Sequence, residues 1–103
     1  MEKEIRKMNF IEFLGTLDND HPDEELSPEI RSLWWIKKGN WEIAHQIAQD
    51  AGTKRGDWIH AHLHRVEGDL GNASYWYSRA GKPNCQNSLT EEWEFLVKDI
   101  LNQ

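Results

Sequence analysis

A segment that repeats after 29 residues is the feature that most limits how this chain can fold. Residues 34–52 (WWIKKGNWEIAHQIAQDAG) align with residues 63–81 (LHRVEGDLGNASYWYSRAG). The alignment pairs small residues at four places: Gly39 with Gly68, Ala44 with Ala73, Ala51 with Ala80, and Gly52 with Gly81. Glycine permits the left-handed backbone of a tight turn, and alanine lets two helices approach closely. The repeat therefore predicts two antiparallel helical hairpins.

Capping residues mark where the expected helices begin. Ser27 precedes a proline at the first helical position, and Asn40 and Asp69 directly follow glycines. Ser88 and Glu91 have the spacing of a capping box. Glycine after each helical pattern predicts where the helix ends. We expect an N-terminal helix over 2–14, extended by Leu17, and further helices over 28–38, 41–51, 53–67, 70–80 and 88–102.

The predicted fold is all-α, with about six helices in one domain over residues 1–103, because no stretch alternates in polarity as a strand would. The domain has an N-terminal helix (1–17), two repeat hairpins (28–52 and 53–81) and a C-terminal capping helix (88–102). The many acids and the proline among residues 18–27 predict that these residues form a solvated loop. They lack the glycine and terminal glutamate of a calcium-binding loop.

The second hairpin resembles the tetratricopeptide repeat. The resemblance rests on Gly68, Asp69, Ala73, Tyr77 and Ala80. The repeat is shorter than the usual 34 residues of that family, and the Leu-Gly pair of its first helix is absent. The family implies a helical-repeat module that binds a protein or peptide without catalysis. The segment 58–81 is also similar to a pattern in small bacterial proteins. This resemblance implies a bacterial origin and does not indicate any particular activity.

A basic and aromatic strip is expected on the inner surface if the repeat interpretation holds. It consists of Arg55, Trp58, His62 and Arg65, with Trp35 and Lys38 as outer candidates from the earlier hairpin. Such a strip predicts an acidic or carboxylate-terminated peptide as partner. In the alternative interpretation, Trp58 belongs to the core and the arginines are ordinary surface charges. Exposed tryptophans would also favour a homo-oligomer, which the sequence does not separate from partner binding.

The histidines provide a second candidate site. His60 and His64 are one helical turn apart, so both imidazoles lie on one face of their helix. Together with His45 of the preceding helix and a carboxylate from Glu67 or Asp57, they would bind zinc as a metal-binding protein or metal-dependent enzyme. The middle histidine lies beside the apolar stripe, and the HExxH motif is absent. The sequence favours histidines packed between helices, with Glu67 bonded to His64 and no cofactor.

Charge and cysteine content exclude several other classes of function. The net charge is −6, and residues 1–30 contain nine acids against three bases. An acidic protein disfavours nucleic acid and anionic membranes as partners. The single cysteine, Cys85, cannot form an internal disulfide, and it has no neighbour that would activate a catalytic thiol. No apolar run reaches the length of a membrane span, so we expect a cytoplasmic protein.

Overall fold

The computed structural model describes residues 8–102 and confirms the all-α class: these residues form six α-helices and one 3-10 turn, without a strand. None of the described helices has the length and apolar character needed to cross a lipid bilayer. The elements are α1 (Phe10–Gly15), the turn η1 (Thr16–Asp18), α2 (Pro28–Lys37), α3 (Trp41–Ala51), α4 (Lys54–Val66), α5 (Leu70–Ala80) and α6 (Leu89–Leu101).

The two copies of the repeat have the same local conformation. Asn40 caps α3 and Asp69 caps α5, and each side chain accepts the backbone N–H three residues further on. The two caps also have similar backbone angles, with ψ of 83° and 80°. The four aligned glycines all have positive φ: 85° at Gly39, 81° at Gly68, 63° at Gly52 and 72° at Gly81. The sequence repeat therefore corresponds to a repeat of turn geometry.

The first helix is shorter than predicted where the structure describes it. Asn9 and Glu12 form a capping box, so α1 begins at Phe10 and not before Met8. Residues 1–7 of the predicted helix lie outside the described residues. Leu17, expected to extend the helix, belongs to the 3-10 turn η1. The difference arises because the capping box satisfies the first N–H groups of a new helix at this point.

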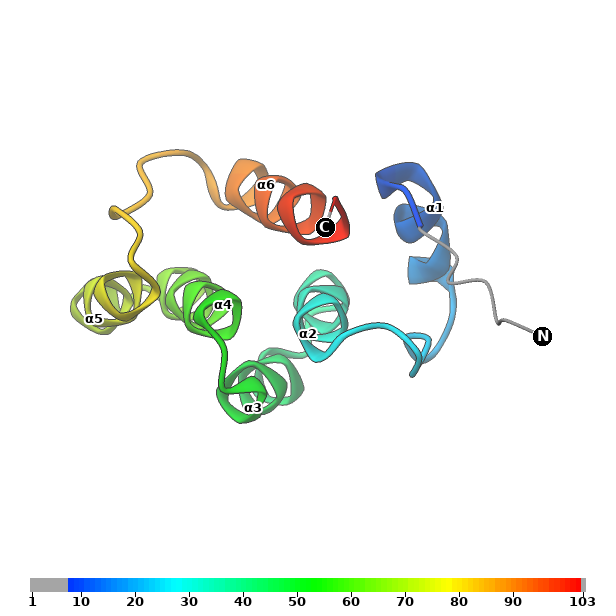
Figure 1. The fold of residues 1–103 in the computed structure, drawn as a ribbon, viewed down its shortest axis with the longest axis horizontal. Coiled ribbons are helices and arrows are strands. Elements are labelled where there is room, and N and C mark those ends of the chain that lie inside the picture. The colour runs from blue at the N-terminus through cyan, green and yellow to red at the C-terminus, as the bar shows by residue number, and fades with distance from the viewer. Residues whose placement is uncertain (1–7, 103) are drawn as a thin grey trace.

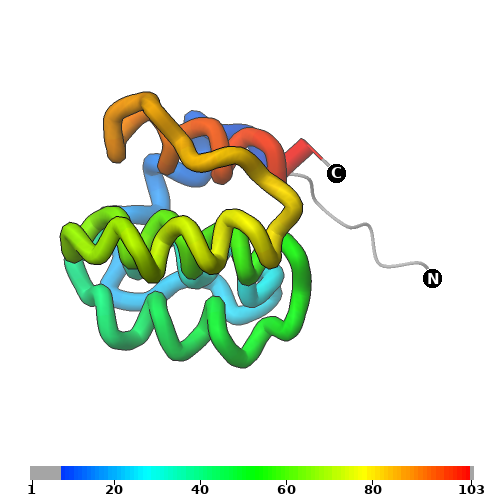
Figure 2. The backbone as a smooth tube through the Cα atoms, turned by 90° about the vertical axis from the view of Figure 1, so that its left-hand side faces the viewer, coloured from blue at the N-terminus to red at the C-terminus, as the bar shows by residue number. Residues whose placement is uncertain are grey.

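Helix α4 lies in the middle of the assembly (Figure 1). It packs along α5 on one side and against α3 on another, while α2 packs along α3. Helix α6 lies across α2 and α4, and α1 contacts α6. The segment between α5 and α6 rises from the end of α5 to the start of α6 (Figure 2). Tetratricopeptide-type packing of the hairpins stays a prediction.

The position of α4 buries it on every side. Its residues from Trp58 to His64 are all buried, whereas Val66 near its end is 42% exposed. Neighbouring helices therefore cover both the apolar side of α4 and the side that bears His60 and His64. The rest of the apolar core comes from the facing sides of these helices: Phe13, Ile30, Leu33, Trp34, Ala44, Ala48, Ala73, Tyr77, Ala80, Trp93, Leu96, Val97 and Ile100.

Gly56 sets the close approach of α3 and α4. A Cβ atom at this position would lie 2.9 Å from the backbone oxygen of Ala48 and 3.1 Å from the Cβ of Ala51. We predict that Gly56→Ala lowers the free energy of unfolding by about 1–3 kcal/mol, although alanine favours helix. The matched control is Gly71→Ala in α5, where nothing lies within 4 Å of the added methyl group.

Urea unfolding monitored by circular dichroism measures both variants. Gly71→Ala should leave the stability unchanged or raise it by up to about 1 kcal/mol. Equal effects of the two substitutions would contradict the importance of the α3–α4 approach.

Candidate functional site

Three histidines from two helices converge between α3 and α4. One ring nitrogen from each of His45, His60 and His64 lies within 4.8 Å of the other two. The rings of His60 and His64 stack with centroids 4.9 Å apart, as expected for side chains one helical turn apart. The His45 ring lies edge-on to both, at 4.4 Å from His60 and 5.6 Å from His64. We call these three residues the histidine cluster.

Two tryptophans cover the histidine cluster. The Trp76 ring of α5 stacks on His60, with centroids 3.8 Å apart and planes 13° apart. The Trp41 ring of α3 stacks on His45 at 4.7 Å, and its Nε1 donates to the backbone oxygen of Leu63 at 2.8 Å. These contacts restrict the rotation of the imidazoles and surround them with apolar surface.

Burial favours the neutral form of His60 and His45. Desolvation lowers the pKa of His60 to about 4, and the neighbouring charges of His45, His64 and Arg79 act in the same direction. Desolvation also lowers the pKa of His45, aided by His64 and opposed by Glu67. At neutral pH both imidazoles therefore have free lone pairs, which is the form that binds a metal ion.

Hydrogen bonding leaves part of the histidine cluster without a protein partner. His64 Nδ1 lies 2.6 Å from Glu67 Oε1, so the carboxylate can hold the proton on Nδ1 and leave Nε2 as an acceptor. His60 is only 3% exposed, and its Nδ1 is buried with no hydrogen-bond partner. An unsatisfied buried nitrogen costs about 1–3 kcal/mol, which a bound ion or water would recover.

The geometry is close to that of a metal centre. A tetrahedral zinc ion with Zn–N bonds of about 2.0–2.1 Å separates its nitrogens by about 3.4 Å. The observed upper limit of 4.8 Å therefore requires only small side-chain movements to reach that arrangement. A second group, formed by His64, Glu67 and Asp69, also lies together, but Asp69 is engaged in capping α5.

The predicted basic and aromatic strip exists as a line along α4, but α6 covers it. Arg55 pairs with Asp99 at 3.6 Å. The Trp58 ring meets Phe95 edge-on at 5.9 Å. His62 and Arg65 both reach Glu92 of α6. Acidic and aromatic residues of α6 at helical spacing match the strip, and Trp58 belongs to the core, as in the alternative interpretation.

Glu92 is the centre of a buried polar network. Its Oε1 accepts from His62 Nδ1 at 2.7 Å and from Arg65 Nη1 at 2.6 Å, and its Oε2 accepts from the Tyr77 hydroxyl. Burial alone would raise the pKa of Glu92, but the hydrogen bonds outweigh it and lower that pKa. Burial and the same carboxylate raise the pKa of Tyr77. The network thus fixes an ionised carboxylate among α4, α5 and α6.

The two outer candidates of the strip lie elsewhere. Trp35 packs edge-on against Trp34 and against His21 of the acidic loop. Lys38 donates to the backbone oxygen of Leu17 at 2.8 Å and lies over the Trp34 ring. Both side chains therefore contact the segment that precedes α2, and neither is in line with the strip on α4.

Sequence reasoning missed the role of Glu92 and of the two covering tryptophans. The signal for Glu92 was its position beside Trp93 and one turn before Leu96, both of which are buried residues of α6. An acid on an apolar face predicts a buried hydrogen-bond network. The signal for Trp41 was its position four residues before His45 on the same helix, a spacing at which side chains meet. Comparisons with protein-family models, curated proteins and solved structures found no match.

Acidification should destabilise the protein through the histidine cluster. The folded pKa of His60 is about 4, below the ordinary value of 6.5, so the unfolded chain binds a proton first as the pH falls. The folded state therefore has its full stability above pH 6.5, and its free energy of unfolding falls by up to about 3 kcal/mol between pH 6.5 and 4. His45 contributes in the same direction, and Glu92 adds a further loss below its ordinary pKa of 4.5.

Urea unfolding at several pH values measures this slope, and an NMR titration of His60 measures its pKa directly. His60→Gln should flatten the slope between pH 6.5 and 4.5, whereas His21→Gln, on the exposed loop, should leave it unchanged. A folded pKa of His60 above 6 in the titration would contradict the prediction.

Loss of the Glu92 carboxylate should strongly destabilise the fold. We predict that Glu92→Ala costs about 3–5 kcal/mol, because Arg65 and two further donors lose their acceptor in the core. The control is Glu94→Ala on the same helix, which forms no ion pair among the described residues and should change stability by less than about 0.5 kcal/mol. Thermal unfolding by calorimetry compares the two, and a similar loss in both would refute the network's role.

Proposed function

We propose that the protein binds one divalent transition-metal ion of the zinc type at the histidine cluster. The observation that supports this most directly is the convergence of three ring nitrogens within 4.8 Å, two of them from buried residues. Imidazole is a preferred ligand of zinc, copper and nickel. The three side chains already lie together, so the fold does not have to rearrange to bring these ligands to one ion.

Two further features support metal binding over simple packing. The low pKa of His60 and His45 removes competition from protons at neutral pH. The bond between His64 and Glu67 is the carboxylate–histidine arrangement that orients metal-ligating imidazoles. A histidine that served packing alone would gain nothing from an unpartnered buried nitrogen. The proposal concerns binding and assigns no reaction.

We also propose, as a second function, that the protein binds an acidic protein or peptide in the cytoplasm. Helix α6 covers most of the strip. The observation that supports this second proposal is a cavity of about 390 Å³ at the edge of the strip, where Trp58 and Lys82 line the wall. Cavities of this size hold small ligands or single side chains.

Titration of the metal-free protein with Zn²⁺ tests the first proposal. Isothermal titration calorimetry should give one ion per chain, and Co²⁺ should give the visible absorption of a tetrahedral complex. At a free Zn²⁺ concentration 100 times the Kd, the free energy of unfolding should rise by about 2.7 kcal/mol. Glu67→Gln should weaken binding by about 10- to 100-fold, because it loosens the orientation of His64.

The ligand variants are His45→Ala, His60→Ala and His64→Ala, each of which should abolish stoichiometric binding. The matched control is His21→Ala, which removes a histidine of the loop and should retain one ion per chain. Circular dichroism shows whether each variant is folded. If Zn²⁺ binds the folded His45→Ala variant as tightly as the unchanged protein, the histidine cluster is not a metal site.

A further inference from the structure

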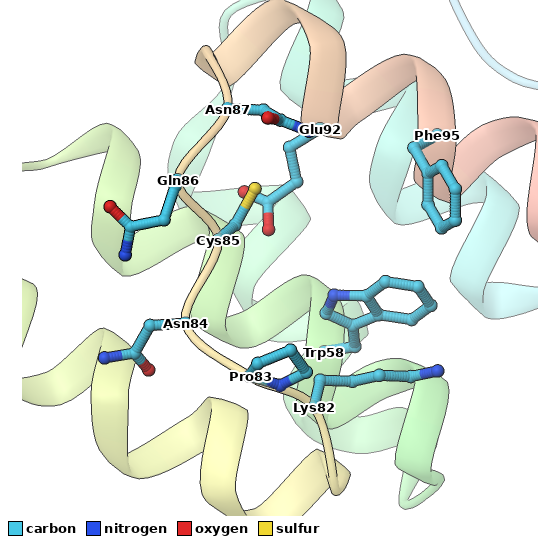
Figure 3. Close-up of a pocket in the computed structure, with 9 residues that line it drawn as sticks. All are labelled: Trp58, Lys82, Pro83, Asn84, Cys85, Gln86, Asn87, Glu92 and Phe95. Atoms are coloured by element: carbon cyan, nitrogen blue, oxygen red, sulfur yellow. The ribbon is translucent and has the colours of Figure 1, made fainter.

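A cavity opens between α4, the segment that connects α5 to α6, and the first half of α6 (Figure 3). Its volume is about 390 Å³. One wall is aromatic, formed by the Trp58 indole and the Phe95 ring, which Figure 3 shows side by side. The remaining residues that line it are Lys82, Pro83, Asn84, Cys85, Gln86, Asn87 and Glu92.

The apolar part of this cavity is preformed and reached from solvent. Trp58 is only 8% exposed, so its ring is fixed by the core, whereas Phe95 is 60% exposed. The two rings are inclined by 62°, so together they form an angled apolar surface for an aromatic or aliphatic group. Exposure of Phe95 costs solvation free energy in the free protein, and an apolar ligand would remove that cost.

Two hydrogen-bond donors at this cavity lack a partner. The indole Nε1 of Trp58 has no hydrogen-bond acceptor in the described structure, and in Figure 3 it is turned toward the connecting segment. The Lys82 ammonium lies 4.3 Å from the centroid of the Trp58 ring and forms no ion pair among the described residues. These two donors therefore lie beside the same ring.

The acidic groups near the cavity are already neutralised. Glu92 accepts three hydrogen bonds, from His62, Arg65 and Tyr77. A second cavity of about 250 Å³ shares the Trp58–Lys82 wall, and its further lining residues include Lys54, Arg55 and Asp99. Because Asp99 is its only acid and pairs with Arg55 at 3.6 Å, the charge around the two cavities is positive.

We propose that this cavity binds a carboxylate with an aromatic or aliphatic body, its apolar part against Trp58 and Phe95 and its carboxylate toward Lys82. We call it the Trp58 pocket. The carboxylate belongs either to a small acid or to the C-terminal residue of a peptide, since both present the same group. The proposal shares no residue with the histidine cluster, and it rests on the second proposed function only where the acid is a peptide.

The first experiment titrates the protein with 3-phenylpropionate and with the neutral analogue 3-phenylpropionamide. A ¹H–¹⁵N NMR spectrum resolves the indole N–H signals, and Trp58→Phe assigns that of Trp58. We expect the acid to shift the Trp58 signal and the amide to bind at least about tenfold more weakly, because a charge-assisted hydrogen bond is lost. Equal binding of acid and amide, or no shift at Trp58, would overturn the proposal.

Matched lysine variants test the charge. Lys82→Gln should weaken binding of the acid by about tenfold. Lys98→Gln should leave it unchanged, although Lys98 also lies over an aromatic ring, that of Phe10 on the other side of α6. Phe95→Ala, at an exposed position, should weaken binding without loss of fold. Equal effects of the two lysine substitutions would contradict the assigned position of the carboxylate.

A peptide arm distinguishes the source of the carboxylate. The probes are an acetylated pentapeptide that ends in phenylalanine and the same peptide with a C-terminal amide. If the free-acid peptide binds more tightly than 3-phenylpropionate and the amidated one does not, the ligand is a peptide C-terminus. If only 3-phenylpropionate binds, the Trp58 pocket serves a small acid, and the proposal of a peptide partner fails while the pocket stands. Binding of neither probe overturns both.

Discussion

The buried carboxylate of Glu92 is the interaction on which the arrangement of the last three helices depends. It accepts hydrogen bonds from His62 and Arg65 of α4 and from Tyr77 of α5, while itself belonging to α6. An ionised carboxylate is stable in the core only when such donors surround it. The network therefore fixes both the register of α6 along α4 and the side of α4 that α6 covers. The connecting segment has to arch over this contact, and the Trp58 pocket lies beneath it.

The alternating histidines of α4 divide between two environments because of helical geometry. Residues two apart on a helix point about 200° apart, so His62 faces α6 while His60 and His64 face α3 and α5. The first environment is an ion-pair network around Glu92, and the second is a cluster of imidazoles packed between aromatic rings. One short segment thus contributes to the stability of the fold on one side and to the candidate metal site on the other.

The sequence predicted local structure better than contacts between distant helices. Caps such as Asn40 and Asp69, and the glycines 29 residues apart, act within a few residues, so the helix boundaries followed from them. The pairing of His60 with His64 and of His64 with Glu67 also followed from spacing along one helix. The covering of the strip by α6 did not, because it depends on a contact between segments about 30 residues apart. Glu92, beside Trp93 and one turn before Leu96, was the one local sign of that contact.

The histidine cluster has costs that packing alone would avoid. Leucine in place of His60 would bury apolar surface without an unpartnered nitrogen, and it would not lose stability on acidification. His60 instead has a buried Nδ1 with no acceptor or donor, and its pKa of about 4 shows how strongly its surroundings oppose the charged form. Unfavourable features of this kind concentrate at functional sites, where a ligand compensates for them. A cation that accepts lone pairs would satisfy three converging imidazoles at once, and it is the ligand that best offsets the cost of the unpartnered His60 nitrogen. This cost is the physical argument that supports the proposed metal binding.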